Sequence, residues 1–228
     1  MGFKLIITGI SGRIGAQVLE QALRDPSVAS VIALSRRPFP ELVRHYSNLE
    51  IVVLSNFRDY SADVTAKLAG ADGCIWCMTT TAGDPALELD YPKAFGNAFA
   101  PIVASGGKMF RYVHLTGATV ERDQDRALWL KGGVRKIKGQ GETQMIEFAK
   151  EAATNKLWET IIARPGMVVT RGTFAGEASL MLTGASGSCI RSDELALALI
   201  DAATHGGEQL LLPSTLLQRG RALFAVRG

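Results

Sequence analysis

The sequence predicts a single-domain α/β protein built on a doubly wound parallel sheet. Short apolar runs typical of buried strands alternate along the chain with amphipathic helical segments. The first apolar run leads directly into a glycine-rich turn and then a helix. The 228 residues are 47% hydrophobic and contain no internal repeat or interdomain linker, so one domain can bury a full core.

The expected elements follow from the hydrophobic pattern and its interruptions. Gly, Pro, Asn and Asp residues mark the turns between the apolar runs. Ser192, Asp193 and Glu194 are expected to form a helix cap and first turn, and a final segment is expected to start at Ser214. Strands are expected at 5–7, 28–34, 51–54, 74–78, 111–116, 160–163 and 209–212, and helices at about 14–22, 91–105 and 134–153, with a further helix ending near 68–72.

Three glycines follow the first strand with a spacing typical of a phosphate-binding turn. Gly9 permits unusual backbone angles, Gly12 leaves room for a phosphate, and Gly15 lets the helix press against the strand. The N–H groups and the positive dipole end of that helix attract a pyrophosphate. An ordinary strand-to-helix turn is the alternative. The predicted phosphate site comprises Thr8, Gly9, Ser11, Gly12, Arg13, Ile14 and Gly15.

The second strand ends in Ser35, Arg36 and Arg37. This is about 20 residues after the glycine turn, where a dinucleotide fold contacts the adenosine ribose. An acidic residue there would select NAD, whereas guanidinium groups suit a 2′-phosphate. We therefore expect NADP(H), held by these three residues. Two solvated arginines in a loop are the alternative.

Two further loops are expected to border the ligand crevice. Asn56, Phe57 or Asp59 is a candidate for contact with the adenine, although simple loop residues fit equally well. Thr79 and Thr80 follow the fourth strand, where small hydroxyl residues face the crevice of a parallel sheet. We expect this loop to lie under the nicotinamide ribose, with a plain polar turn as the alternative.

Composition narrows the function classes. With 25 basic and 22 acidic residues, the charge is too balanced to favour nucleic acid as a partner, although it suits an anionic ligand. No apolar run reaches membrane-span length and no signal-peptide layout is present, so a soluble cytoplasmic protein is expected. Three cysteines argue against a disulfide framework, and Cys74 and Cys77 lie in an apolar run that favours packing over redox chemistry. No metal site is expected.

Four segments together carry a resemblance to a known family: Thr-Gly-x-x-Gly-x-x-Gly at 8–15, Ser35-Arg36-Arg37, Arg164-Pro165-Gly166 and the segment 190–196. Over nearly its whole length the chain resembles the atypical short-chain dehydrogenases/reductases, especially the small Tat-interacting-protein-like members and the related NmrA-like regulators. The resemblance implies a Rossmann nucleotide-binding core at 1–165 and a small substrate-side lobe at 166–228. It also adds Lys138 and Pro165 to the cofactor site. A monomer or homodimer is expected, although the sequence carries no sign of the oligomeric state.

The expected catalytic residues are incomplete. Enzymes of that superfamily place a tyrosine four residues before a lysine on the long helix, with a serine or threonine after the fifth strand. Lys138 resembles that lysine, but Val134 stands four residues earlier and cannot donate a proton. Thr116 or Thr119 is a candidate for the hydroxyl. His114 projects to the same side of its strand as Thr116 and is a candidate proton donor or a packed histidine.

Three functions fit intact cofactor motifs beside this altered catalytic set. The first is an NADP(H)-dependent oxidoreductase acting on a small carbonyl, enone or polyketide-like molecule. The second is a non-redox isomerase, cyclase or dehydratase-like enzyme, and the third is a nucleotide-sensing regulator. The segments 79–95, 117–133 and 170–190 are expected to cover the substrate. Apolar residues in or near them are candidates for an apolar ligand site or for the core, namely Trp129, Met167, Phe174 and Met181.

Overall fold

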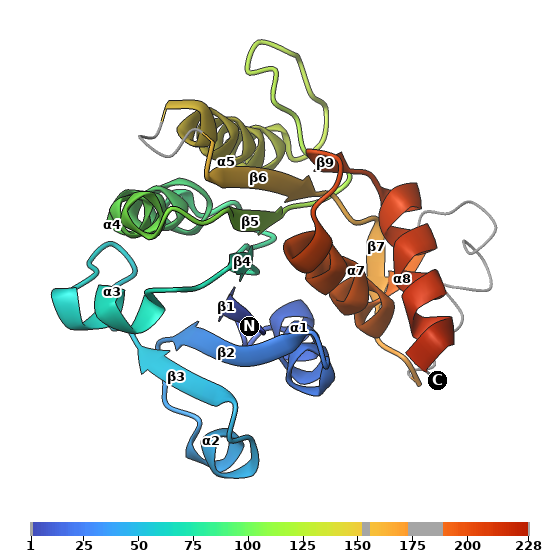
Figure 1. Ribbon diagram of the computed structural model, residues 1–228. Helices are drawn as coiled ribbons and strands as arrows, with labels where there is room; N and C mark the ends of the chain where they lie inside the picture. Colours follow the sequence, from blue (N-terminus) through green and yellow to red (C-terminus); the bar gives the residue numbers. More distant parts are fainter. Residues whose placement is uncertain (1, 152–155, 173–188, 228) are drawn as a thin grey trace.

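The computed structural model describes residues 2–151, 156–172 and 189–227 (Figure 1). Within these ranges, seven parallel strands form one sheet in the order β3-β2-β1-β4-β5-β6-β9, which confirms the predicted doubly wound architecture. The strand order reverses at β1 and β4, and such a switch opens a ligand crevice at the carboxyl ends of the strands. The strands are β1 (Phe3–Thr8), β2 (Val28–Ser35), β3 (Leu49–Val53), β4 (Gly73–Trp76), β5 (Phe110–Leu115), β6 (Trp158–Ala163) and β9 (Leu210–Leu211).

Helices cover both faces of the sheet, on opposite sides in Figure 1. Alternation along each strand divides the core: Leu5 and Ile7 pack with one apolar cluster, and Ile6 packs with the other. An aromatic group around Phe95 and Trp76 fills the second cluster. The first face carries α1 (Arg13–Arg24), α2 (Pro40–His45), α7 (Ser192–His205) and α8 (Pro213–Arg227), and the second carries α3 (Ala62–Leu68), α4 (Tyr91–Gly106) and α5 (Gly132–Glu151).

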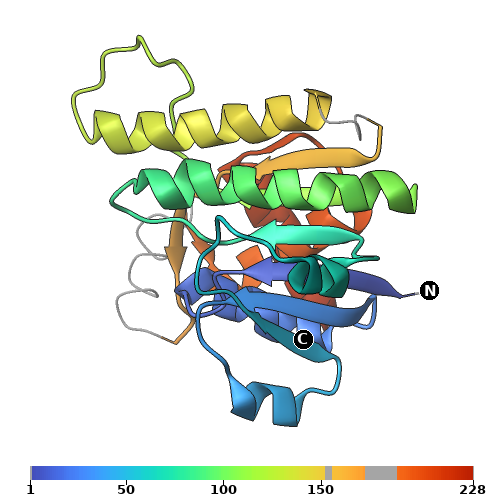
Figure 2. The ribbon, with the colours of Figure 1, turned by 90° about the vertical axis from the view of Figure 1, so that its left-hand side faces the viewer.

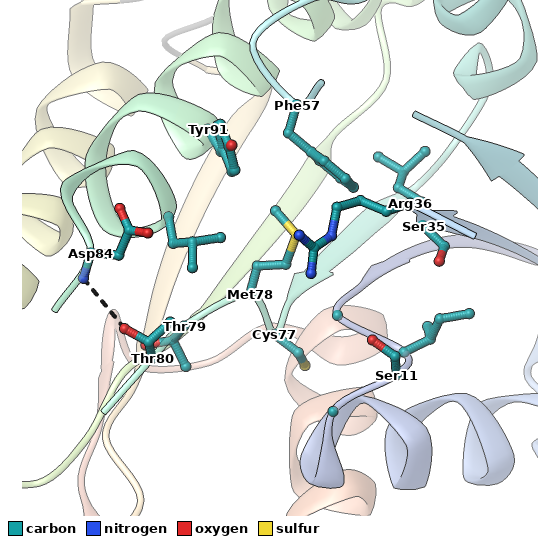
Figure 3. A pocket seen from close by; sticks show the side chains of 15 residues that line it. Ser11, Ser35, Arg36, Phe57, Cys77, Met78, Thr79, Thr80, Asp84 and Tyr91 are labelled. Atoms are coloured by element: carbon teal, nitrogen blue, oxygen red, sulfur yellow. Dashed lines mark hydrogen bonds between the residues drawn. The ribbon is translucent and has the colours of Figure 1, made fainter. Parts of the chain in front are cut away.

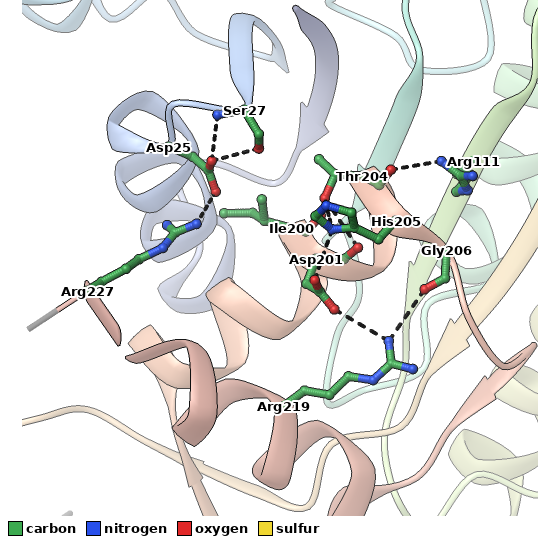
Figure 4. Close-up of polar contacts among 10 residues, drawn as sticks. All are labelled: Asp25, Ser27, Arg111, Ile200, Asp201, Thr204, His205, Gly206, Arg219 and Arg227. Atoms are coloured by element: carbon green, nitrogen blue, oxygen red, sulfur yellow. Dashed lines mark hydrogen bonds and ion pairs between the residues drawn. The ribbon is translucent and has the colours of Figure 1, made fainter. Parts of the chain in front are cut away.

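The C-terminal part is joined to this core. The strand β9 pairs with β6, and α7 packs against α1. Arginines fix α8: Arg227 pairs with Asp25 after α1, and Arg219 lies 3.6 Å from Asp201 on α7 (Figure 4). A separate pair of parallel strands, β7 (Met167–Val169) and β8 (Cys189–Arg191), lies beside α7 and α8. The assignment of 166–228 to the substrate side stays a prediction.

Some elements were not expected from the sequence. The helix α2 has six residues and no buried side chain, so it carries no helical hydrophobic period. Residues 86–90, expected to be loop, form a turn of π-helix, η1 (Ala86–Asp90), that runs directly into α4. The strands β7 and β8 have three residues each, too few for an alternation signal. The fourth strand ends at Trp76 rather than at Met78.

The cysteines are free thiols. Of the two for which packing was predicted, Cys74 is buried and Cys77 is partly buried, and Cys189 is buried as well. Burial raises the pKa of Cys77 to about 12, which makes its thiolate scarce near neutral pH. In the described ranges, no helix combines the length and the apolar character needed to cross a membrane.

Candidate functional site

The glycine turn between β1 and α1 has little room for side chains. Gly9 has a φ of +70°, and a Cβ atom there would lie 2.7 Å from the carbonyl oxygen of Cys77. A Cβ atom on Gly15 would lie 2.2 Å from the carbonyl oxygen of Gly9, so Gly15 lets α1 approach the turn that follows β1, rather than the strand itself as expected. A Cβ atom on Gly12 would meet only the Gly9 oxygen, at 3.2 Å. The turn is therefore tightly packed at Gly9 and Gly15, whereas the space beside Gly12 is largely open.

The start of α1 has the properties of an anion site. Gly12 caps the helix without any side-chain hydrogen bond, and the first turn contains no acidic residue. The first-turn N–H groups and the helix dipole thus favour an anion at this end. These features fit a dinucleotide pyrophosphate.

A cavity of about 300 Å³, the nucleotide cavity, opens beside this turn at the carboxyl ends of β1, β2 and β4. Figure 3 shows the Arg36 side chain reaching into it. Phe57 lines it, whereas Asn56 and Asp59 do not and are hydrogen-bonded to each other, so Phe57 is the best placed of the three adenine candidates. The lining residues are Gly9, Ile10, Ser11, Gly12, Leu34, Ser35, Arg36, Phe57, Cys77, Met78, Thr79, Thr80, Asp84, Leu87 and Tyr91.

A second cavity, the arginine pocket, is lined by Ser11, Ser35, Arg36 and Arg37 and has a volume of about 350 Å³. The Ser35 hydroxyl accepts a hydrogen bond from the Arg37 backbone N–H at 3.2 Å and so shapes this loop. Both arginines are exposed, and neither forms an ion pair with a described carboxylate. Their guanidinium groups are available to an anionic ligand.

Lys138 on α5 is held by a buried carboxylate. Its Nζ donates to the Thr79 hydroxyl at 2.5 Å and lies 3.2 Å from Glu88 Oε1. Glu88, on η1 and only 1% exposed, also accepts from the Thr79 hydroxyl at 2.8 Å and from the Thr80 backbone N–H at 2.9 Å. A Cβ atom on Gly141 would lie 2.4 Å from the Glu88 carbonyl oxygen, so this glycine lets α5 approach η1. The network fixes the ammonium group beside the loop after β4.

Sequence reasoning missed Glu88. Its one signal was an acidic residue between leucines in Ala86-Leu87-Glu88-Leu89, where a carboxylate in an apolar setting implies a buried partner.

The hydroxyl of Thr116 donates a hydrogen bond to a second buried carboxylate, that of Glu142. Glu142 is fully buried and accepts from Thr116 Oγ1 at 2.7 Å, from Arg122 Nε at 2.7 Å and from Arg164 Nε at 2.8 Å. Burial raises the pKa of Glu142, but the hydrogen bonds from Arg164, Thr116 and Arg122 outweigh it and hold the pKa below its usual value. Thr116 is thus engaged in a structural network, and its catalytic role stays a prediction.

His114 is buried beside the same network. Its Nδ1 lies 3.0 Å from the Tyr112 hydroxyl, and the ring is 2% exposed. Burial lowers the pKa of His114 to about 4, with Glu142 opposing and Lys138 adding to that shift. The imidazole is therefore uncharged at neutral pH. Its role as a proton donor stays a prediction.

This pKa predicts a pH-dependent stability. The pKa of His114 is about 6.5 in the unfolded chain and about 4 in the folded chain. Because the unfolded chain therefore binds the proton more tightly, the stability linked to the uncharged His114 ring is fully present only above pH 6.5. That contribution, about 3 kcal/mol, is lost as the pH falls from 6.5 to 4. Urea unfolding of wild type and His114→Asn over this range should show a free-energy difference that narrows with acidification. A constant difference would contradict the assignment.

A third cavity, the lysine cavity, has a volume of about 480 Å³ and shares the lining residue Thr80 with the nucleotide cavity. Val134 lines it, at the position expected for a phenol. Trp129 is fully exposed, so the expectation that it belongs to the core was wrong. It lines none of these cavities, whereas the adjacent Leu130 lines the lysine cavity. The lining residues are Thr80, Thr81, Gly117, Thr119, Val120, Leu130, Lys131, Val134, Arg135 and Lys138.

Several predicted residues lie outside these cavities. Thr8 is buried, and its hydroxyl accepts from the Cys77 backbone N–H at 3.1 Å, which ties the ends of β1 and β4 together. The Pro165 carbonyl accepts from the Ala118 N–H at 2.9 Å. Arg13 and Ile14 belong to the first turn of α1 and line none of the three cavities described above. Most of the expected 170–190 cover, including Phe174 and Met181, lies outside the described residues. Met167 is on β7 and about half exposed.

Comparisons with known proteins agree with this fold. No protein-family model matches the chain. A curated relative, leucinostatins biosynthesis cluster protein T of Purpureocillium lilacinum, is 32% identical over 108 residues, which are 43% of this chain and 38% of the relative. The match thus spans well under half of that protein.

Solved structures cover far more of the chain. The PhqB reductase domain of Penicillium fellutanum has a TM-score of 0.65 at 15% identity, over 92% of this chain and 66% of that one. Candida albicans Gre2, in complex with NADPH, gives 0.68 at 17% identity, over 92% and 77%. A short-chain dehydrogenase/reductase family oxidoreductase of Burkholderia thailandensis gives 0.66 at 17% identity, over 100% and 97%.

Sheet order and glycine turn define an α/β protein of the Rossmann class. Within that class, the chain has the fold of the short-chain dehydrogenases/reductases.

Proposed function

We propose that this protein is an NADP(H)-dependent oxidoreductase acting on a small apolar carbonyl, enone or polyketide-like molecule. One observation carries the proposal: the nucleotide cavity contains the glycine turn and Arg36, which also lines the arginine pocket, and it shares the lining residue Thr80 with the lysine cavity. A nicotinamide placed near Thr79 and Thr80 would face a substrate beside Lys138. The curated relative's place in a biosynthesis cluster supports a secondary-metabolite substrate.

The residues around the two cavities would have different roles in this reaction. NADPH, when bound, supplies the hydride. Lys138 donates a hydrogen bond to the substrate oxygen that gains negative charge, and Glu88 and Thr79 fix the position of its ammonium group. Thr80 and Val120 help to exclude water from that oxygen. Because Val134 cannot protonate the product, the proton comes from water or a substrate hydroxyl, and a conjugated substrate needs such help least.

A non-redox isomerase, cyclase or dehydratase-like activity is the second candidate. The observation that favours it is the absence of an acid at Val134, together with the engagement of Thr116 by Glu142. A regulator that only senses the nucleotide is the third. The redox enzyme consumes NADPH absorbance with a substrate, the non-redox enzyme forms product without that change, and the regulator binds NADPH without turnover. A cytoplasmic monomer or homodimer, with no nucleic-acid partner, stays our prediction.

Replacing Arg36 with alanine should weaken NADPH binding about 10- to 100-fold and leave NADH binding unchanged. The reason is the loss of charge-assisted hydrogen bonds to the 2′-phosphate, which NADH lacks. Fluorescence titration of both nucleotides measures the change. Arg44→Ala, an exposed arginine on α2, is the matched control and should affect neither. Equal affinity of the wild type for NADH and NADPH would refute the NADP assignment.

A further inference from the structure

The lysine cavity has an unbalanced charge. Of the described residues that line it, three are cations and none is an acid. Lys138 is neutralised by Glu88. Lys131 and Arg135 have no carboxylate partner among the described residues, and the only described acceptor of an Arg135 side-chain N–H is the Thr119 carbonyl, bound by Nε at 2.5 Å. Two positive charges at this cavity therefore lack a counter-charge.

The backbone adds to that positive field. Lys131 directly precedes α5. Arg135 lies in the first turn of that helix, and this turn contains no acidic residue. Since the N-terminal end of a helix is already positive, cations there are unfavourable for folding. The cofactor does not account for them, because its phosphates are assigned to the glycine turn and the arginine pocket, which share no residue with Lys131 or Arg135. An anionic group of another ligand would balance the charge.

The rest of the cavity is suited to an apolar body. Val120 and Val134 line its wall, and Leu130 at its edge is 78% exposed. Covering so exposed an aliphatic side chain with an apolar ligand removes hydrophobic surface from water and is therefore favourable. The cavity volume of about 480 Å³ lies within the range of small-molecule sites.

We propose that the lysine cavity binds a small amphipathic carboxylic acid. The carboxylate pairs with Lys131 and Arg135, and the hydrocarbon part lies along Val120, Leu130 and Val134 toward Lys138. The inference deepens the proposed function, on which it rests, by naming an acidic substrate class. Its binding step is nevertheless measurable without turnover.

Isothermal titration calorimetry with octanoate and its uncharged analogue octanamide tests the proposal. We expect octanoate to bind at least about tenfold more tightly, and this preference to fall as salt screens the pair. Lys131→Gly and Arg135→Gln should each remove about tenfold of octanoate affinity and leave octanamide unchanged. Lys131 has a left-handed φ of 49°, so glycine relieves backbone strain and this variant keeps its fold. Lys136→Gln is the matched control, because its Nζ donates to the Gln124 carbonyl and does not line the cavity.

Equal binding of octanoate and octanamide would overturn the proposal, as would an equal loss in Lys136→Gln and Lys131→Gly. So would binding to phosphatidylserine vesicles that depends on Lys131 while octanoate does not bind, since the cations would then serve a membrane surface. Separate titrations of the wild type with NADPH and with octanoate distinguish the two proposals. Octanoate binding that persists while wild type binds no NADPH defeats the NADP assignment alone, and NADPH binding without octanoate preference defeats the acid site alone.

Discussion

Gly15→Ala should abolish measurable NADPH binding and destabilise the protein by about 3 kcal/mol or more. The added Cβ would lie 2.2 Å from the carbonyl oxygen of Gly9 and 2.6 Å from its carbonyl carbon. Both atoms belong to the backbone, so the clash is relieved only if α1 or the turn moves. That movement displaces the N–H groups that would hold the pyrophosphate. Urea unfolding and NADPH titration measure the two effects.

Gly106→Ala is the control for this substitution. Gly106 is also helical, at the end of α4, and a Cβ there would meet nothing within 4 Å. It should leave nucleotide binding intact and change stability by less than about 1 kcal/mol. Wild-type NADPH affinity in Gly15→Ala would show that the turn is not the phosphate site.

Lys138→Met should lower turnover at least about 100-fold, because the hydrogen bond to the developing negative charge is lost. It should also destabilise the protein by about 3–5 kcal/mol, since Glu88, 1% exposed, would keep a buried charge without its cation. Steady-state kinetics, once a substrate is in hand, and thermal unfolding report these effects separately.

The double variant Lys138→Met/Glu88→Gln distinguishes chemistry from folding. It removes both charges of the pair and should recover most of the lost stability while turnover stays low. Glu88→Gln alone leaves Lys138 in place with its Thr79 contact. If the double variant regained turnover together with stability, Lys138 would be only a structural partner of Glu88, and the proposed role at the substrate oxygen would fail.

The sequence contained enough local information to predict the fold. Gly9, Gly12 and Gly15 mark the strand–turn–helix unit, and apolar runs mark the remaining long elements. The short elements could not be predicted, because six residues in α2 and three each in β7 and β8 are too few for a hydrophobic period.

The candidate site was predicted unevenly for a related reason. Residues that belong to short continuous motifs do line the nucleotide cavity: Gly12 in the glycine turn, and Ser35 and Arg36 at the end of β2. Residues brought together by tertiary contacts were missed: Glu88 meets Lys138 only because α5 packs on η1. Likewise, a hydroxyl such as that of Thr116 looks available in sequence until its partner Glu142 is located in space.

The packing of α7 on α1 has a consequence for how this chain is made. The helix α1 packs on β1 and β2, which are its neighbours in the sequence, and also on α7 (192–205), which lies far along the chain from it. During translation, the surface of α1 that α7 covers stays exposed until the residues between the two helices and α7 itself have been synthesised, and in that interval it is open to aggregation or to capture by a chaperone.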